Sequence, residues 1–213
     1  MVKVDKQVTA SFDIDAQKTF SPLCPEELPV VEGDQIVEEL NRNKEFACLH
    51  VASRDAHPLN AVWIANAYQP PMSKVEGYPD VDLRWPVHAI VGTAGFEFLP
   101  GLDGKRYEYQ VFKGIVPDQH PYGACYHDFK EHQSTGAIEF LKVNNISTVI
   151  CGGLATDYCV KTTVLQLLKA GFKVIVNLGA CRGIAPETTA QAIAEMQSAG
   201  AVMIASAAEL HLR

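Results

Sequence analysis

The stretch TVICGGLATDYCVKTTVLQLLKAGFKVIVNL, residues 148–178, decides the fold class. Residues 148–151 form a β-branched, apolar run that predicts a buried strand, and residues 157–169 show the periodicity of a helix that ends at Gly171. A second apolar run at 173–178 predicts another strand. Because a helix connects the two strands, the stretch favours a parallel sheet with a helix packed on its face.

The same alternation continues on both sides of this stretch. Further strands are expected at 8–14, 46–52, 107–112 and 202–205, and further helices at 34–43, with Asp34 as N-cap, at 135–143 and at 186–198. This order predicts an α/β, three-layer αβα fold around one open, mostly parallel six-stranded sheet of Rossmann-like topology. No repeat, linker or composition break divides the chain, so we expect a single domain over residues 1–213.

Composition excludes several classes of protein. With 47% hydrophobic and 20% charged residues the chain is not disordered, and 18 basic against 25 acidic side chains give a net charge of −7. Nucleic acid is therefore not an expected partner, because phosphate binding needs a basic face. No secretion signal and no apolar run of membrane-spanning length is present, which predicts a cytoplasmic protein without a membrane partner. A homo-oligomer is compatible with the sequence.

Two long segments, 54–104 and 113–132, interrupt the regular pattern, and only a short helix at 62–67 is expected within them. Irregular stretches of this length inside a compact fold are usually functional. Parallel sheets hold their ligands beyond the carboxyl ends of the strands. The residues that directly follow each predicted strand are therefore the candidates for a functional site.

Five side chains with useful chemistry fall at these strand ends: Asp15, Asp55, His57, Lys113 and Cys159. Taken singly, each has an ordinary explanation, since an aspartate after a strand is usually a turn or cap residue and a lone lysine is usually solvated. Their joint placement at one edge of the sheet favours a reactive site.

Cys159 is the strongest nucleophile candidate among the six cysteines. It lies in the first turn of the predicted helix 157–169, where free N–H groups and the helix dipole stabilise a thiolate and lower its pKa. Gly152 and Gly153 allow a tight bend, so the N–H groups at this helix start can form an oxyanion hole. A thiolate beside such donors predicts acyl transfer. The other thiols are Cys48 and Cys151, expected to be inert core residues, and Cys24, Cys125 and Cys181, to which no role is assigned.

Acid–base and metal chemistry also have candidate residues. Asp15 is the expected base for the thiol, and Lys113 would keep Asp15 ionised and balance charge near the sulfur. Asp55 and His57, two residues apart in an extended segment, point to the same side, and His88 could complete a site of two histidines and one carboxylate. A D-x-H motif by itself is more often structural than metal-binding.

Five motifs together closely resemble the nicotinamidase/pyrazinamidase group of the isochorismatase-like cysteine hydrolases. They are DIDAQKTF at 13–20, RDAHP at 54–58, WPVH at 85–88, VFKG at 111–114 and GLATDYCV at 153–160. They occur in the order of that family and span nearly the whole chain. The resemblance implies a metal-assisted cysteine amidohydrolase that converts nicotinamide to nicotinate and ammonia through a thioester, in NAD salvage, and that also accepts pyrazinamide.

The resemblance also implies roles for individual residues. Asp15, Lys113 and Cys159 would form the catalytic triad, and the N–H groups of Ala155 and Cys159 the oxyanion hole, with the Leu154–Ala155 peptide bond cis. One divalent metal ion, zinc, iron or manganese, would be bound by Asp55, His57 and His88. The ring nitrogen of the substrate would ligate this metal, in a pocket lined by Phe20, Trp85, Tyr126, Tyr158 and Leu154.

One departure from the family pattern concerns the metal. Many relatives carry a further histidine shortly after the D-x-H motif, whereas this chain continues LNAVW at 59–63. Metal binding is therefore expected to use three side chains plus waters. His120 and His127 are expected to be solvated or gating residues rather than ligands.

Three other functions are also compatible with parts of the sequence. A second enzyme of the same superfamily, acting on a carbamoyl or small carboxamide substrate, would keep the fold and the thiol, although such relatives generally lack the metal triad. Vinyl-ether hydrolysis of the isochorismatase type does not need Cys159. A catalytically silent binding module would show a broken triad or an exposed apolar surface, and neither is visible in the sequence.

Overall fold

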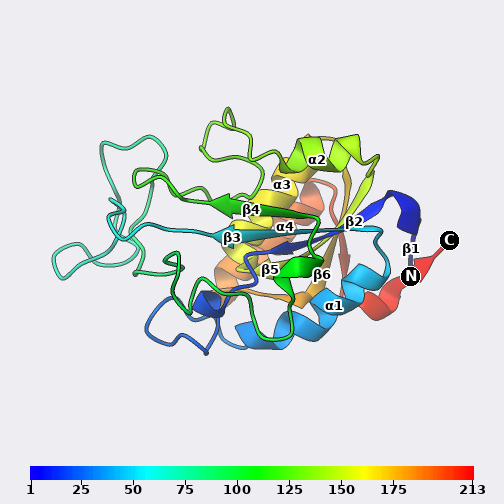
Figure 1. The fold of residues 1–213 in the computed structure, drawn as a ribbon, viewed down its shortest axis with the longest axis horizontal. Helices are drawn as coiled ribbons and strands as arrows, with labels where there is room; N and C mark the ends of the chain where they lie inside the picture. Colours follow the sequence, from blue (N-terminus) through cyan, green and yellow to red (C-terminus); the bar gives the residue numbers. More distant parts are fainter.

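The computed structural model describes residues 1–213 and is built on a six-stranded sheet with the strand order β4-β3-β2-β5-β6-β7 (Figure 1). Every neighbouring pair is parallel. The strands are β2 (Thr9–Ile14), β3 (Leu49–Asp55), β4 (Tyr109–Lys113), β5 (Thr148–Leu154), β6 (Lys173–Arg182) and β7 (Val202–Ile204). The expected open parallel sheet is confirmed.

Helices cover both faces of this sheet. They are α1 (Val37–Glu45), α2 (Ala137–Val143), α3 (Lys161–Lys169) and α4 (Pro186–Ser198). The main core lies between the sheet and α2, α3 and α4, where Phe12, Leu141 and Leu167 are fully buried. On the opposite face α1 buries Leu40 against Leu154. The layers are therefore helix, sheet and helix, as the alternation predicted.

The two ends of the chain form a second, small sheet that the sequence did not predict. Strand β1 (Val2–Val4) pairs in parallel with β8 (Leu210–Leu212), and the termini lie side by side (Figure 1). Val4 and Leu210 pack on Ile150 and Ile175 of the main sheet, so this ladder extends the layer that contains α1. No helix of the protein has both the length and the apolar character needed to cross a bilayer.

Three local expectations are wrong. The helix expected at 34–43 begins as a 3₁₀ turn, Gly33–Ile36, and α1 starts after it, so Ile36 and not Asp34 occupies the N-cap position. No helix forms at 62–67, where the chain makes isolated bridges instead. The second strand begins at Leu49 rather than at residue 46, because Phe46 ends α1 as its C-cap, and Cys48 is consequently exposed rather than buried.

The two irregular segments gather at the carboxyl edge of the sheet, where the arrows of β3 and β4 point (Figure 1). A small cluster of its own, which includes Trp63, Val75, Val81 and Trp85, orders the segment between β3 and β4. Apolar packing therefore fixes this segment without regular secondary structure. It forms one wall of the site described below.

Candidate active site

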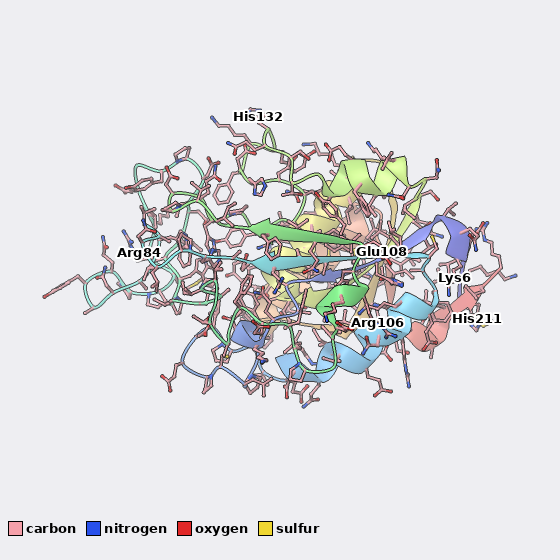
Figure 2. The ribbon with its side chains drawn as sticks, viewed as in Figure 1. Lys6, Arg84, Arg106, Glu108, His132 and His211 are labelled. Atoms are coloured by element: carbon pink, nitrogen blue, oxygen red, sulfur yellow. The ribbon has the colours of Figure 1, made fainter.

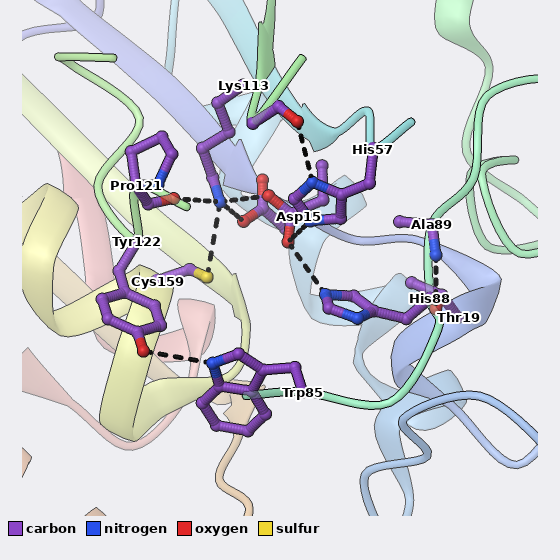
Figure 3. A network of polar contacts seen from close by, with 12 residues as sticks. Asp15, Thr19, His57, Trp85, His88, Ala89, Lys113, Pro121, Tyr122 and Cys159 are labelled. Atoms are coloured by element: carbon purple, nitrogen blue, oxygen red, sulfur yellow. Dashed lines mark hydrogen bonds and ion pairs between the residues drawn. The ribbon is translucent and has the colours of Figure 1, made fainter. Parts of the chain in front are cut away.

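Asp15, Lys113 and Cys159 meet at the carboxyl edge of the sheet, from the ends of β2 and β4 and the segment after β5 (Figure 3). Lys113 Nζ lies 2.9 Å from Asp15 Oδ2 and 3.6 Å from Cys159 Sγ. All three side chains are buried. The structure thus brings together the three residues expected to form a triad.

Lys113 has two further partners that the sequence did not indicate. Its ammonium group also contacts Asp55 Oδ1 and donates to the carbonyl of Pro121 at 3.2 Å (Figure 3). Burial would lower the pKa of Lys113, but Asp15 and Asp55 outweigh this effect and raise the pKa well above its ordinary value. Lys113 is therefore a permanent cation that links the triad to Asp55.

Asp15 is held in an unusual backbone conformation with φ of 46°. A non-glycine residue in the left-handed region is strained, and such strain gathers at functional sites. Ser53 Oγ donates a hydrogen bond of 2.6 Å to Asp15 Oδ1, and the backbone N–H of Asp15 donates to the Ser53 carbonyl. Burial raises the pKa of Asp15, and Lys113 offsets this only in part. Asp15 is thus positioned as a base that is stronger than an ordinary aspartate.

Glycine at position 153 allows the strand before Cys159 to approach β2. Gly153 has φ of 141°, and a Cβ atom there would lie 1.9 Å from the carbonyl oxygen of Ile14. Asp15 follows Ile14 directly. A side chain at position 153 would therefore displace the end of β2 and the base that it carries.

Cys159 lies in a π-helical turn, Thr156–Val160, that leads into α3. The expectation of a lowered thiol pKa is wrong: burial raises the pKa of Cys159 well above its ordinary value, although Lys113 lowers it. Asp15 and Asp55 also favour the neutral thiol, and an oxygen of Asp15 lies within 4.8 Å of the sulfur. The thiol is therefore protonated in the free protein and needs a base, which Asp15 can supply.

A hydrogen-bond donor is available next to this sulfur. The Leu154–Ala155 peptide bond is cis, and the N–H of Ala155 donates to no other group of the protein. Ala155 and Cys159 line the same cavity. A free N–H beside a nucleophile is the arrangement that stabilises an oxyanion.

A second cluster of side chains lies on the other side of Lys113. Asp55 Oδ2 is 3.4 Å from His57 Nε2 and 3.8 Å from His88 Nε2. The Nδ1 atom of His57 lies 3.0 Å from the Gly114 carbonyl, and that of His88 lies 2.7 Å from the Pro86 carbonyl. Nδ1–H groups that donate to carbonyls leave both Nε2 lone pairs free to face Asp55.

These residues fit a divalent metal ion. A carboxylate and neutral imidazoles suit zinc, iron and manganese, and backbone carbonyls on the far nitrogens orient histidine ligands in metalloproteins. Burial, aided by the neighbouring His57, lowers the pKa of His88 to about 3, so its ring is neutral. Buried His57 Nε2 has no hydrogen-bond partner. A bound cation would satisfy this atom and the carboxylate together.

Gly114 supports this cluster through its missing side chain. It has φ of 68°, and a Cβ atom there would lie 2.3 Å from the ring of His57. Only glycine lets the chain turn after β4 while its carbonyl stays close to His57 Nδ1. The position of the glycine in the VFKG motif therefore requires a residue without a side chain.

Cys159 of the first cluster and Asp55 and His88 of the second line one small cavity. Its apolar wall, which is mostly aromatic, consists of Phe20, Leu28, Trp85, Tyr122, Tyr158 and Ile184, and its polar residues include Asp55, His88, His120 and Cys159. Trp85 and Tyr158 pack edge to face at 5.0 Å, and Trp85 Nε1 donates to the Tyr122 hydroxyl at 3.2 Å. The cavity suits a single flat, small ligand.

The isochorismatase domain family matches residues 9–208 of this sequence. The chain belongs to the isochorismatase family. A nicotinamidase from Escherichia coli strain K12 is 35% identical over 187 residues, which cover 83% of this chain and 85% of that protein. The solved Acinetobacter baumanii nicotinamidase/pyrazinamidase has a TM-score of 0.87 at 31% identity and covers 95% of this chain and 98% of its own.

A third relative carries a metal. The pyrazinamidase of Pyrococcus horikoshii, solved in complex with zinc, has a TM-score of 0.74 at 31% identity and covers 92% of this chain and 98% of its own. The resemblance inferred from the five motifs is therefore confirmed at the level of the family.

The structure corrects the expected ring pocket of this isochorismatase-family chain. Tyr126 does not line the cavity but a separate hollow with Phe129 and Thr162, and Tyr122 occupies the pocket wall instead. The side chain of Leu154 is buried in the core beneath the site and also does not line the cavity. Strand ends alone do not show which aromatic residue of a long loop turns inward.

The largest difference between the predicted and the observed site concerns His120. It was expected to be solvated or to gate the site, yet it is 4% exposed and lies against His57, with ring centroids 5.1 Å apart. Burial, aided by His57 and His88, lowers the pKa of His120 well below its ordinary value, so its ring is neutral. His127, by contrast, is only half-buried.

Two further residues of the site, Ser53 and Tyr122, were not predicted from the sequence. Ser53 had a weak signal, since it is a hydroxyl near the end of a strand, two residues before the D-x-H motif. Tyr122 had none, because its position depends on how an irregular segment folds back.

Proposed function

We propose that this isochorismatase-family protein is a nicotinamidase that also hydrolyses pyrazinamide. The observation that carries the proposal is that Cys159, Asp55 and His88 all line one mostly aromatic cavity. A carboxamide on a nitrogen-containing ring has its two reactive features at opposite ends. Such a molecule can present its amide to the sulfur and its ring nitrogen to the cluster at the same time.

In the first half of the reaction, Asp15 takes the proton of the Cys159 thiol, and the sulfur attacks the amide carbon to form a C–S bond. The N–H groups of Ala155 and Cys159 hold the resulting oxyanion. Asp15 then returns the proton to the nitrogen as the C–N bond breaks. Ammonia leaves and a thioester remains on Cys159.

In the second half, water attacks the thioester while Asp15 takes its proton. The C–S bond breaks, the acid is released and the thiol is restored with the proton from Asp15. Lys113 keeps a positive charge next to both carboxylates during each half. It lowers the cost of every anionic species that forms beside it.

Asp55, His57 and His88 would hold the divalent metal, be it zinc, iron or manganese. When bound, the metal supplies Lewis-acid coordination for the ring nitrogen of the substrate. The protein prepares for this with the two Nδ1–H···O=C contacts of the histidines and with Gln17. The side-chain amide of Gln17 donates to the Asp55 carbonyl at 2.9 Å and accepts from the Asp55 N–H at 2.8 Å.

An ammonia-release assay with nicotinamide, pyrazinamide and a carbamoyl amide tests the proposal. The purified protein should hydrolyse the two ring carboxamides, lose activity with a strong chelator and recover it with added zinc, iron or manganese. Preference for the carbamoyl amide without a metal requirement would instead favour the other amidohydrolase function. No turnover of any amide with metal supplied would favour a silent module.

Trp85→Ala should raise KM for nicotinamide by about 10-fold with a smaller change in kcat. The indole provides aromatic contact area for the ring, and such contacts contribute on the order of 1 kcal/mol beyond burial. Steady-state kinetics measures the effect. Tyr68→Ala is the control, since Tyr68 is 95% exposed and should leave KM unchanged. A KM for Trp85→Ala equal to that of the wild type would remove Trp85 from the substrate pocket.

The decrease of kcat/KM at acidic pH should reflect the protonation of Asp15. Asp15 must be ionised to accept a proton, so kcat/KM should fall as pH drops through the raised pKa of Asp15, above the ordinary aspartate range. Ser53→Ala removes a hydrogen bond that favours the charged carboxylate and should move this decrease about one unit higher in pH.

Ser147→Ala, at an exposed site, is the control and should leave the decrease at the same pH. If Ser53→Ala lowers kcat/KM equally at every pH, Ser53 does not act on the ionisation of Asp15.

A further inference from the structure

We propose that His120 is a fourth protein ligand of the metal centre, supplied from the segment after β4. The proposal deepens the metal site proposed above and rests on that part of the proposed function, not on the identity of the substrate. It starts from a buried side chain without a partner. Neither Nδ1 nor Nε2 of His120 makes a hydrogen bond, and both atoms are shielded from solvent.

A buried imidazole with no partner for either nitrogen is costly, because burial of a polar group without compensation is unfavourable. His120 cannot be explained as a solvated residue at 4% exposure. Its ring is surrounded by His57, His88 and the edge of Trp63, whose centroid is 4.5 Å away. The group that satisfies it must therefore come from the cavity that it lines.

The positions of the nitrogen atoms identify that group. One ring nitrogen from each of His57, His88 and His120 lies within 4.8 Å of the others. Metal–imidazole bonds of about 2.0–2.1 Å place neighbouring ligand atoms about 3–4 Å apart. The distances of 3.4 and 3.8 Å from Asp55 Oδ2 to His57 and His88 fall in this range, and the three histidines need only small shifts to reach it.

The backbone fixes His120 in this position. Its own N–H donates to the Asp80 carbonyl at 2.8 Å, and the carbonyl of the next residue, Pro121, accepts from Lys113 Nζ at 3.2 Å. The segment is thus held on both sides of His120, once by the loop between β3 and β4 and once by the buried cation. These two backbone contacts hold the ring of His120 next to those of His57 and His88.

This arrangement also compensates for the missing histidine after the D-x-H motif. The residues at 59–63 include no histidine, and His120 supplies an imidazole from a position 63 residues after His57. Together with Asp55, which lies near His57 and His88, the three imidazoles would supply four protein ligands, the number that zinc takes in tetrahedral sites. A substrate nitrogen must then enter as a fifth or sixth ligand.

Cobalt(II) binding tests the proposal without any substrate. We expect His120→Ala to weaken cobalt affinity by about 100-fold or more, measured by competition with a chromophoric chelator, and to change the visible cobalt spectrum. His120→Gln keeps the volume of the side chain and should show the same loss if the larger truncation fails to fold. His132→Ala is the control, because His132 is exposed on an outer loop (Figure 2) and should bind cobalt as the wild type does.

X-ray absorption on the zinc-loaded wild type provides a readout that needs no variant, and its imidazole scattering should fit three histidines. Wild-type cobalt affinity in folded His120→Ala and His120→Gln, or a zinc shell with two imidazoles, would overturn the proposal and leave His120 as a wall of the substrate pocket. Metal binding that depends on His120 in a protein that does not hydrolyse nicotinamide would refute the proposed substrate alone.

Discussion

Cys159→Ala is expected to reduce ammonia release from nicotinamide by about 10⁴-fold or more, the scale on which loss of a nucleophile acts in a triad. The sulfur is the one nucleophile that lines the cavity beside both Asp15 and the free Ala155 N–H. Steady-state and single-turnover assays measure the loss. Substrate affinity should be preserved, because the pocket wall and the metal ligands remain.

Cys48→Ala is the matched control for this variant. It removes a thiol that is exposed and distant in the fold from the carboxyl edge, and its activity should equal that of the wild type. Cys159→Ser should be nearly as inactive as the alanine variant, because a hydroxyl is harder for Asp15 to deprotonate than a thiol. Ammonia release by Cys159→Ala within about tenfold of the wild type would exclude the thioester route.

Lys113→Met should have the second-largest effect, and it should act on both activity and stability. Lys113 is 1% exposed and contacts Asp15, Asp55 and Cys159. Removal of the cation leaves two carboxylates in one buried site, and breaking a buried pair costs about 3–5 kcal/mol. Activity should fall by about 10²-fold or more, because Asp15 then holds its proton to higher pH.

Urea unfolding monitored by fluorescence, together with the amide assay, measures both effects. The control is Lys105→Met, which removes an exposed lysine from the connection before β4 and should change neither quantity. A stable and fully active Lys113→Met protein would show that Asp15 needs no cation. Full stability with lost activity would restrict Lys113 to catalysis.

Much of the fold could be read from periodicity. The helix Pro186–Ser198 has the predicted bounds, and five of the six strands begin within two residues of the predicted position, β3 being the exception. These helices and strands are predictable because their apolar faces pack within the sheet layers. Packing of this kind requires apolar residues at regular intervals, and this leaves a repeating pattern in the sequence. The exceptions lie where a cap or a turn sets the boundary, as at Phe46 before β3.

Most residues of the candidate site could also be predicted from the sequence, for a related reason. Asp15, Asp55, Lys113 and the segment before Cys159 each follow a strand, and parallel strands bring their carboxyl ends to one edge. Proximity at that edge follows from topology alone. The raised pKa of the Cys159 thiol could not be predicted in this way, because it results mainly from burial, which a position at a helix start does not indicate.

The sequence by itself thus determined the layers, the sheet and the strand-end residues, because each depends on local pattern and on a general rule of parallel sheets. Only the tertiary structure decided the inward turn of Tyr122, the burial of His120 and the contact between Lys113 and Asp55. These depend on how two long segments without periodicity pack against each other. Such packing arises from many non-repeating contacts between distant residues, and no local pattern in the chain records them.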